Sequence, residues 1–490
     1  MTKIQNRPNK GANLTITICA CFLLLVYANT MNHSLSSIGI MACIGYAVYY
    51  LSWFSHFKKK LNYYTIFLSL TLVFYFGQFI LLLWGVPMLS GRTILDNRLP
   101  FDSLIRTGVF IINAMTCFHI GVLLSTMKNE NDTVDLDEKN NKKIPDENEI
   151  LLLKRAGILV LLVSFLPSIS LLVENINTTM IEGYGAIFQS ENYSAGGFDN
   201  IRRFLSMFTV PALLMLIIAY RNDKKLIIVK LLLAVYLALY FLSGSRIAGV
   251  MLIIALFLIF HYWYKPINTK TILAVVGLAI CLLVVASTIS NIRNTLYLAE
   301  NKFQAIIEGL TATWRQNPLF LALEEAGFSF LTTGTVLTYS PSIIPHQNGL
   351  SYIKGIWMLI PNLFWDVHPA ASINTDIVFS SFLTQYGGIG SSFIAEAYWN
   401  FSYVSLIFMF AFGSFVGLVT RKLSEYAKRG KALKFFFAIY AGLIFLSYVR
   451  SDTVSFWRNF IYYGVLPVAF VWFVTSAFKG SRNKFNKPNL

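Results

Sequence analysis

Long apolar stretches separated by short polar loops run along almost all of this 490-residue chain. Hydrophobic residues make up 56% of it and charged residues only 13%, a mixture too apolar for a soluble domain of this size. A helix needs roughly 20 apolar residues to cross a membrane. The sequence therefore predicts an all-α polytopic membrane protein with about twelve transmembrane helices, near residues 13–30, 34–54, 65–86, 104–125, 156–174, 205–220, 226–243, 247–263, 271–290, 401–419, 435–449 and 460–477.

Basic residues follow these spans in an alternating pattern. With the N-terminus inside, every inward segment is rich in Lys and Arg, as cytoplasmic loops are. This pattern predicts that both termini are cytoplasmic and that residues 291–400 face outward. It also accounts for the net charge of +16, together with attraction to anionic membrane lipids, without any nucleic acid.

The predicted organisation has three parts. Residues 1–290 hold nine helices with short loops and a charged cytoplasmic linker at 126–150, residues 291–400 form a large outward loop, and residues 401–490 hold three helices and a basic tail. The linker contains Asp135-Leu136-Asp137, which matches a glycosyltransferase metal motif, but the segment is too short for a nucleotide-binding domain. All five cysteines fall inside predicted spans, so the sequence predicts no extracellular disulfide framework. No outward His/Cys/Asp cluster has metal-ligand spacing, so no metal site is predicted either.

The outward loop 291–400 is neither a clean span nor a soluble domain. Apolar residues recur at helical spacing over residues 295–316, and Asn317-Pro318 ends that run, which predicts an amphipathic helix. Residues 377–399 are apolar but broken by glycine and serine. This composition favours re-entrant or interfacial structure, because irregular backbone is tolerated only beside protein or a wet cavity.

The outward bases are almost all arginine, whereas the inward ones are mostly lysine. Arginine binds phosphate or carboxylate through two parallel hydrogen bonds, so this choice favours an anionic ligand over simple snorkelling to lipid headgroups. A phosphate at this face would belong to a lipid. Arg246 is the sharpest case, because it ends a hairpin of a few residues at the membrane surface. The outward bases are Arg92, Arg98, Arg106, Arg202, Arg203, Arg246, Arg293, Arg315, Arg450 and Arg458, with Lys302 and Lys354.

An acid and a histidine are the candidate proton acceptors. Glu396 directly precedes a predicted span, and a partly desolvated carboxylate there suits a general base, with a salt bridge to an outward arginine as the alternative. His368 lies close to Asp376 and is the second candidate, with a structural hydrogen bond as the alternative. The run Gly387-Gly388-Ile389-Gly390 either offers backbone N–H groups to an anion or breaks a helix.

Two segments resemble features of Wzy-type O-antigen and capsule repeat-unit polymerases. They are the hairpin Ser243-Gly244-Ser245-Arg246 and the block from Gly387-Gly388 to Asn400-Phe401, which leads into a span. The large outward loop late in the chain, with Pro361 after an apolar run, also fits. In that family a glycine often follows the Asn-Phe pair, and Ser402 stands there instead.

The resemblance implies a GT-C-like fold in the bacterial plasma (inner) membrane. The growing glycan would pass from undecaprenyl diphosphate to the terminal hydroxyl of a new lipid-linked repeat unit, without a cofactor. Lipid-linked donor and acceptor, membrane lipids, a chain-length regulator and a flippase are the implied partners. The diphosphate needs charge stabilisation, for which the candidates are Arg246, Arg293, Arg450, Arg458, Arg202 and Arg203. The candidate glycan contacts are Trp365, Asp366, Asp376, Tyr398 and Trp399.

Two other functions fit the same sequence. One is a ligase that moves finished glycan to another acceptor. The other is a glycolipid flippase or secondary transporter, which would need functional charges near the bilayer midplane. His119 is the only ionisable candidate apart from cysteines at the centre of a predicted span.

Overall fold

The computed structural model describes residues 10–57, 61–86, 99–127, 145–181, 197–243, 246–268, 301–315, 317–360 and 390–466, with a few isolated positions besides. Every regular element in these ranges is helical, which confirms the predicted all-α class for the part described. The chain forms two compact units. Unit 1 comprises residues 1–136, 323–421 and 445–457, and unit 2 comprises residues 137–322, 422–444 and 458–490.

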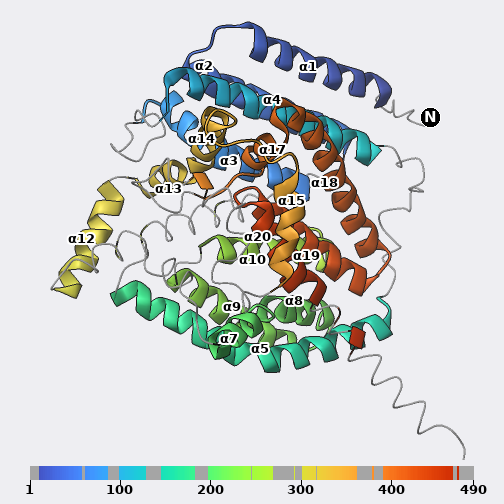
Figure 1. Cartoon of the computed structure of the whole chain (residues 1–490). Coiled ribbons are helices and arrows are strands. Elements are labelled where there is room, and N and C mark those ends of the chain that lie inside the picture. The colour runs from blue at the N-terminus through green and yellow to red at the C-terminus, as the bar shows by residue number, and fades with distance from the viewer. Residues whose placement is uncertain are drawn as a thin grey trace, which may run out of the picture. The chain divides into compact units, whose positions relative to one another are not determined.

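Unit 1 contains the first four helices and most of the segments around the site. Its elements are α1 (Lys10–Thr30), α2 (Leu35–His56), α3 (Tyr63–Leu83), α4 (Phe101–Met127), α14 (Phe328–Tyr339), α15 (Leu350–Lys354), the 3-10 turns η2 (Gly355–Leu359) and η5 (Ser402–Val404), α17 (Phe393–Phe401) and most of α18 (Ser405–Lys428) and α20 (Thr453–Arg458). Helices α1, α2 and α4 pack side by side (Figure 1).

Unit 2 is built around one long helix. Its elements are α5 (Glu147–Ile181), α7 (Gly197–Ser206), α8 (Thr209–Ala219), α9 (Leu226–Leu242), α10 (Arg246–Ile259), the π-helical turns η1 (Phe260–Tyr264) and η6 (Asn459–Val465), and α12 (Lys302–Arg315). Helices α7 and α8 both pack against α5. Two further helices, α13 (Pro318–Ala326) and α19 (Ala432–Tyr448), are shared between the units.

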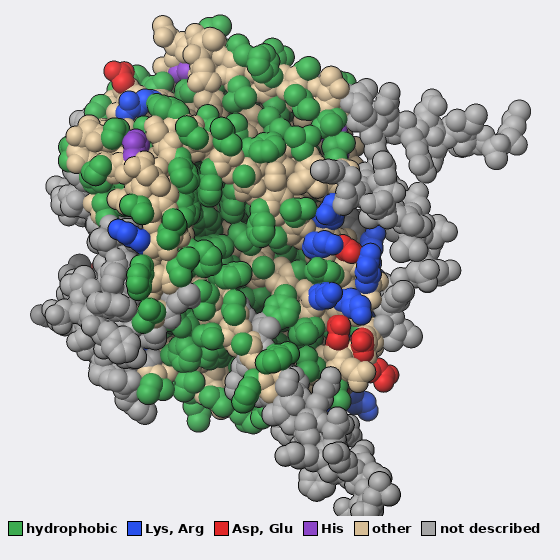
Figure 2. Space-filling model, turned by 45° about the vertical axis from the view of Figure 1, so that its right-hand side comes forward, with side chains coloured by type: hydrophobic (Ala, Val, Ile, Leu, Met, Phe, Trp, Pro, Cys, Tyr) green, Lys and Arg blue, Asp and Glu red, His purple; other side chains and the backbone are tan. Residues whose placement is uncertain are grey.

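Seven helical segments of the described chain are long and apolar enough to cross a membrane. They overlap the spans predicted at 13–30, 34–54, 65–86, 104–125, 156–174, 205–220 and 401–419, and shorter apolar helices occupy three more, at 226–243, 247–263 and 435–449. Large apolar side chains are exposed along them, such as Leu162 (72%) and Leu166 (74%). Hydrophobic side chains also dominate the surface in Figure 2. The chain is therefore a multi-pass membrane protein. The total of twelve stays a prediction, because nearly all of 271–290 and part of 460–477 lie outside the described residues.

Helices α4 and α18 cross at a seam of small residues. A Cβ added to Gly121 would lie 2.1 Å from the carbonyl oxygen of Phe410, and one added to Gly413 would lie 2.0 Å from that of Phe118. The Ser414 hydroxyl donates across the seam to the Gly121 carbonyl at 3.2 Å. Small residues let apolar helices approach closely enough for such contacts, so this seam fixes α18 against the bundle.

Residues 393–428 form a hairpin instead of one straight span. A continuous helix would separate Phe393 from Phe412 by about 28 Å. Their ring centroids are instead 5.7 Å apart. Helix α17 therefore runs back along α18, and Ser402 at the turn has a φ of 51°. This re-entrant path agrees with the structure predicted for residues 377–399, over the part described.

Two further helices of the loop 291–400 show how it is built. Helix α12 lies within the helix predicted at 295–316 and ends just before Asn317, as expected. Helix α14 was not predicted. It is almost wholly buried against α3, α4 and α17, and its threonine hydroxyls donate to carbonyls within the helix, as Thr335 does to Leu331 at 2.9 Å.

Candidate functional site

Helix α17 carries the first candidate, Glu396, into the interior of unit 1. The Ser392 side chain caps the helix by accepting a hydrogen bond from the Ala395 N–H at 3.1 Å. Ser392 is itself held by hydroxyl contacts with Tyr75 at 2.7 Å and Thr333 at 3.0 Å. The start of α17 is thus anchored to α3 and α14, and this anchoring fixes the depth of Glu396.

The Glu396 carboxylate is fully buried and has several hydrogen-bond donors. Oε1 accepts from the Ser351 hydroxyl at 2.8 Å. Oε2 accepts from the Thr453 N–H at 2.7 Å, the Thr453 hydroxyl at 2.8 Å and the Tyr448 hydroxyl at 3.2 Å. An ionised carboxylate only accepts, so this set of donors matches its hydrogen-bonding capacity. Glu396 therefore joins α15, the end of α19 and the start of α20.

This geometry bears on the role predicted for Glu396. A general base must reach the proton that it removes. The Glu396 side chain has 0% exposed area, and both of its oxygens are occupied by donors. The arrangement therefore favours a positioning residue that holds three segments together.

Arg450 lies on the short turn that Glu396 anchors, between α19 and α20. Its guanidinium carbon is 5.4 Å from the centre of the Phe74 ring. A Cβ added to Gly390, whose φ is +83°, would lie only 2.9 Å from the Arg450 Nε atom. The preceding residue is tied to α3, because the Tyr75 hydroxyl donates to the Val449 carbonyl at 3.2 Å. The last glycine of the predicted run thus leaves room for the Arg450 side chain.

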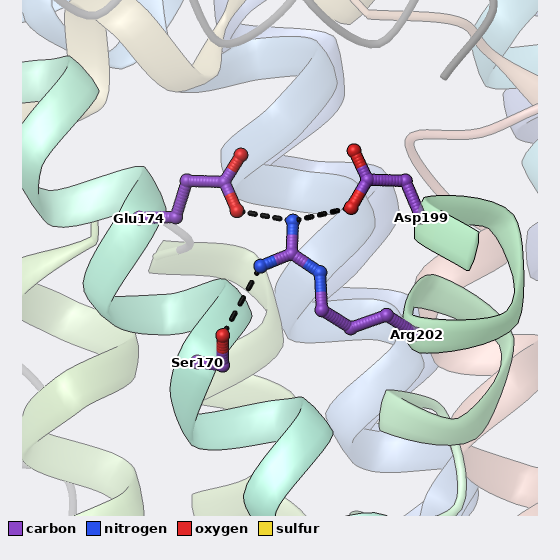
Figure 3. Close-up of polar contacts among 4 residues, drawn as sticks. All are labelled: Ser170, Glu174, Asp199 and Arg202. Atoms are coloured by element: carbon purple, nitrogen blue, oxygen red, sulfur yellow. Dashed lines mark hydrogen bonds and ion pairs between the residues drawn. The ribbon is translucent and has the colours of Figure 1, made fainter. Parts of the chain in front are cut away.

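Arg202, in unit 2, lies between two carboxylates (Figure 3). Its Nη2 atom contacts the Glu174 carboxylate and lies 3.0 Å from Oδ1 of Asp199. Its Nη1 atom donates to the Ser170 hydroxyl at 3.1 Å. Helix α5 supplies Glu174 and Ser170, and α7 supplies Asp199 and Arg202 itself. The charge of Arg202 is therefore already neutralised, and a diphosphate would have to compete with these acids.

Two other predicted arginines, Arg203 and Arg458, also belong to unit 2. Arg203 is half-buried on α7, and Arg458 is exposed at the end of α20. Helix α7 and the turn η6, which directly follows Arg458, are neighbours in unit 2, because the Phe204 and Tyr462 rings are 5.6 Å apart. Arg246 is the first residue of α10, but its side chain and the whole of Arg293 lie outside the described residues.

Two of the predicted glycan contacts, Tyr398 and Trp399, are among the described residues. Trp399 has no exposed area, and its Nε1 atom donates to the Pro345 carbonyl at 3.0 Å. Tyr398 is 5% exposed and packs edge-on against Phe110. Both rings therefore serve packing in this structure and have no open face for a sugar. His368, Trp365, Asp366 and Asp376 lie outside the described residues.

Sequence reasoning missed the polar residues that surround Glu396 and the hairpin turn. Ser351, Tyr448 and Thr453 lack any motif, and only the hairpin brings them to Glu396.

The turn also borders an open cavity of about 320 Å³, lined by His346, Asn348, Asn400, Phe401, Ser402 and Val404. Ser402, noted above as a substitute for glycine, was the one sequence signal at this position.

His119, the midplane candidate for a transporter, lies in a closed hydrogen-bond network in unit 1. Its Nε2 atom is 2.7 Å from the Ser52 hydroxyl, and its Nδ1 atom contacts the Tyr64 hydroxyl. Its side chain is completely buried. Both ring nitrogens are thus engaged, which favours a packing role between α2, α3 and α4.

Comparison with known protein families gives a match over nearly the whole chain. The family model described as O-antigen polysaccharide polymerase Wzy matches residues 13–482, nearly the whole chain. No curated protein and no solved structure matches.

Proposed function

The chain belongs to the O-antigen polysaccharide polymerase family Wzy, and we propose that it joins oligosaccharide repeat units carried on undecaprenyl diphosphate at the outer face of the bacterial plasma membrane. The family match over residues 13–482 is the observation that carries this proposal. The growing glycan leaves its lipid diphosphate and is transferred to a hydroxyl of the next lipid-linked unit. The basic inward loops support cytoplasmic termini and an outward active face.

Arginines stabilise the departing diphosphate in this proposal. Arg450 is the best placed among the described residues, because Glu396 anchors its turn and Gly390 leaves space for its side chain. Fixed donors stabilise a developing negative charge without reorganisation, which is the source of their catalytic value. The other arginines proposed to hold the diphosphate are Arg246, Arg293, Arg458, Arg202 and Arg203.

Glu396 acts in this scheme by positioning the Arg450 turn. His368 is then the remaining base proposed from sequence, and Trp365, Asp366 and Asp376 keep their proposed contacts with the glycan. Tyr398 and Trp399 are buried on α17 and serve its packing in this scheme.

The test is complementation of a polymerase-null strain, followed by analysis of glycan chain length. Arg450→Ala should leave mainly single repeat units at normal protein level, and Arg450→Lys should restore only short chains, because lysine lacks the planar fork. Arg246→Ala is expected to behave as Arg450→Ala does. Lys354→Ala, an exposed lysine of α15, is the matched control and should give normal chains. Long chains in both arginine variants would remove the diphosphate role.

The same materials separate the competing functions. Purified protein that moves lipid-linked glycan across liposomes but makes no polymer would establish a transporter. Protein that transfers finished glycan to another acceptor without lengthening it would establish a ligase.

A further inference from the structure

The cavity at the turn between α17 and α18 has the composition of a binding site for a polar ring. Its volume of about 320 Å³ lies within the range of small-molecule sites, roughly 300–1,000 Å³. His346, Asn348, Asn400 and Ser402 supply polar groups, while Phe401 and Val404 supply an apolar wall. A sugar offers the same combination of hydroxyl groups and apolar C–H faces.

His346 lies at the edge of this cavity, with two polar neighbours at its Nδ1 atom. Its Nδ1 atom lies 3.1 Å from the Trp399 carbonyl oxygen, which only accepts hydrogen bonds. This contact is a hydrogen bond in the tautomer with the proton on Nδ1, and in that neutral ring Nε2 has a free lone pair. The Ser340 hydroxyl oxygen is a second neighbour of Nδ1, at 3.2 Å. Among the described residues no group is bonded to Nε2, and the ring is only half-buried.

The backbone around the cavity is strained and firmly held. Asn348 and Ser402 have φ angles of 48° and 51°, and Gly349 has a φ of +86°. Non-glycine residues in such conformations persist only where their surroundings fix them, and they gather at functional sites. Here the Gly349 N–H donates to Oδ1 of Asn400 at 3.0 Å, while Nδ2 of Asn400 donates to the Ser351 hydroxyl at 2.7 Å. The cavity wall is thus continuous with the Glu396 network.

We propose that this cavity binds the terminal sugar of the acceptor and that Nε2 of His346 is the general base for its hydroxyl group. The inference rests on the polymerase function proposed above. The acceptor oxygen forms a bond to the anomeric carbon of the donor glycan as the bond from that carbon to the diphosphate oxygen breaks. The diphosphate leaves with the electron pair, and the hydroxyl proton passes to Nε2. The imidazolium then returns this proton to water.

The direct test uses two histidine replacements in the purified full-length protein. His346→Asn keeps an amide N–H near the Nδ1 position, for the Trp399 carbonyl, and removes Nε2. His346→Gln keeps a polar group near Nε2 that cannot take a proton. With lipid-linked repeat units extracted from a polymerase-null strain, both variants should polymerise at least about 100-fold more slowly than wild type. Acceptor binding should weaken more in the Asn variant than in the Gln variant.

A second pair of variants tests the cavity without touching the core. Val404→Trp places a large ring at the mouth of the cavity and should block the acceptor. Ile407→Trp is the matched control, because Ile407, on the following helix α18, is likewise exposed, at 70%, but is not among the residues that line the cavity. Polymerisation should be lost in the first variant and kept in the second.

The outcomes separate this inference from the function on which it rests. If wild type polymerises and Arg450→Ala does not, but both His346 variants remain fully active, the base assignment is overturned while the function stands. A loss confined to His368→Asn would instead assign the base to that residue. If Val404→Trp stays active, the acceptor does not bind in this cavity. If wild-type protein forms no polymer, the proposed function itself fails.

Discussion

Glu396 in unit 1 and Arg202 in unit 2 are two ionisable side chains stabilised in opposite ways. Glu396 has no exposed area, and all its described partners are uncharged donors from Ser351, Tyr448 and Thr453. Arg202 is 18% exposed and faces two carboxylates, each more than 40% exposed. Water can replace the partners of Arg202, whereas nothing can reach those of Glu396. Glu396 is therefore part of the framework, whereas Arg202 can exchange its partners for a ligand.

Removing the Glu396 carboxylate should have the largest effect. Glu396→Ala leaves buried hydroxyl and amide donors without an acceptor, and each such group costs about 1–3 kcal/mol. We expect the protein to unfold at a much lower temperature in detergent, as measured by intrinsic fluorescence, and to make no polymer. Glu308→Ala, at an exposed position on α12, is the control and should change the free energy of unfolding by less than about 0.5 kcal/mol. A Glu396→Ala protein as stable as wild type would show that the network holds nothing together.

Removing one donor should have an intermediate effect. Ser351→Ala deletes the donor to Oε1 and also an acceptor for Asn400, at a cost of about 1–3 kcal/mol in stability. Ser342→Ala removes an exposed hydroxyl between α14 and α15 and serves as the control. Equal thermal stability of the two variants would contradict the coupling between α15 and α17.

The contrast also shows what the sequence could predict. Apolar length and basic loops predict the helical spans, because both are local properties of the chain. Arg202 and Glu396 stand out by charge alone. Their partners do not, because Glu174 and Thr453 reach them only through the packing of separate helices.

The hairpin changes the depth that the sequence predicted for Glu396. Residues 401–419 are predicted as a span directly after Glu396, which would put Glu396 at the membrane surface. The turn at Ser402 folds α17 back along α18 and carries Glu396 inward instead. Ser402 is the one sequence signal of this turn, and the serine there occupies a conformation that glycine prefers.

Relieving the strain at that turn should have a smaller effect of opposite sign. Ser402 has φ 51° and ψ −139°, a region that glycine enters without a Cβ clash. Ser402→Gly should therefore raise the stability of the protein by about 1 kcal/mol, measured as a higher Tm. Ser342→Gly, at a position without a positive φ, should lower it slightly. A lower Tm for Ser402→Gly would mean that the side chain contributes more than the strain costs.

The Arg202 pair should contribute least to stability. Arg202→Gln breaks contacts to Glu174 and Asp199 whose carboxylates remain open to water, so the free energy of unfolding should fall by less than about 1 kcal/mol. High salt should remove most of that difference, because exposed charges are screened. If Arg202 also takes the diphosphate, the variant should make shorter glycan chains at nearly unchanged Tm. A large loss of Tm that persists in high salt would instead make Arg202 a framework charge like Glu396, and the distinction between the two regions would disappear.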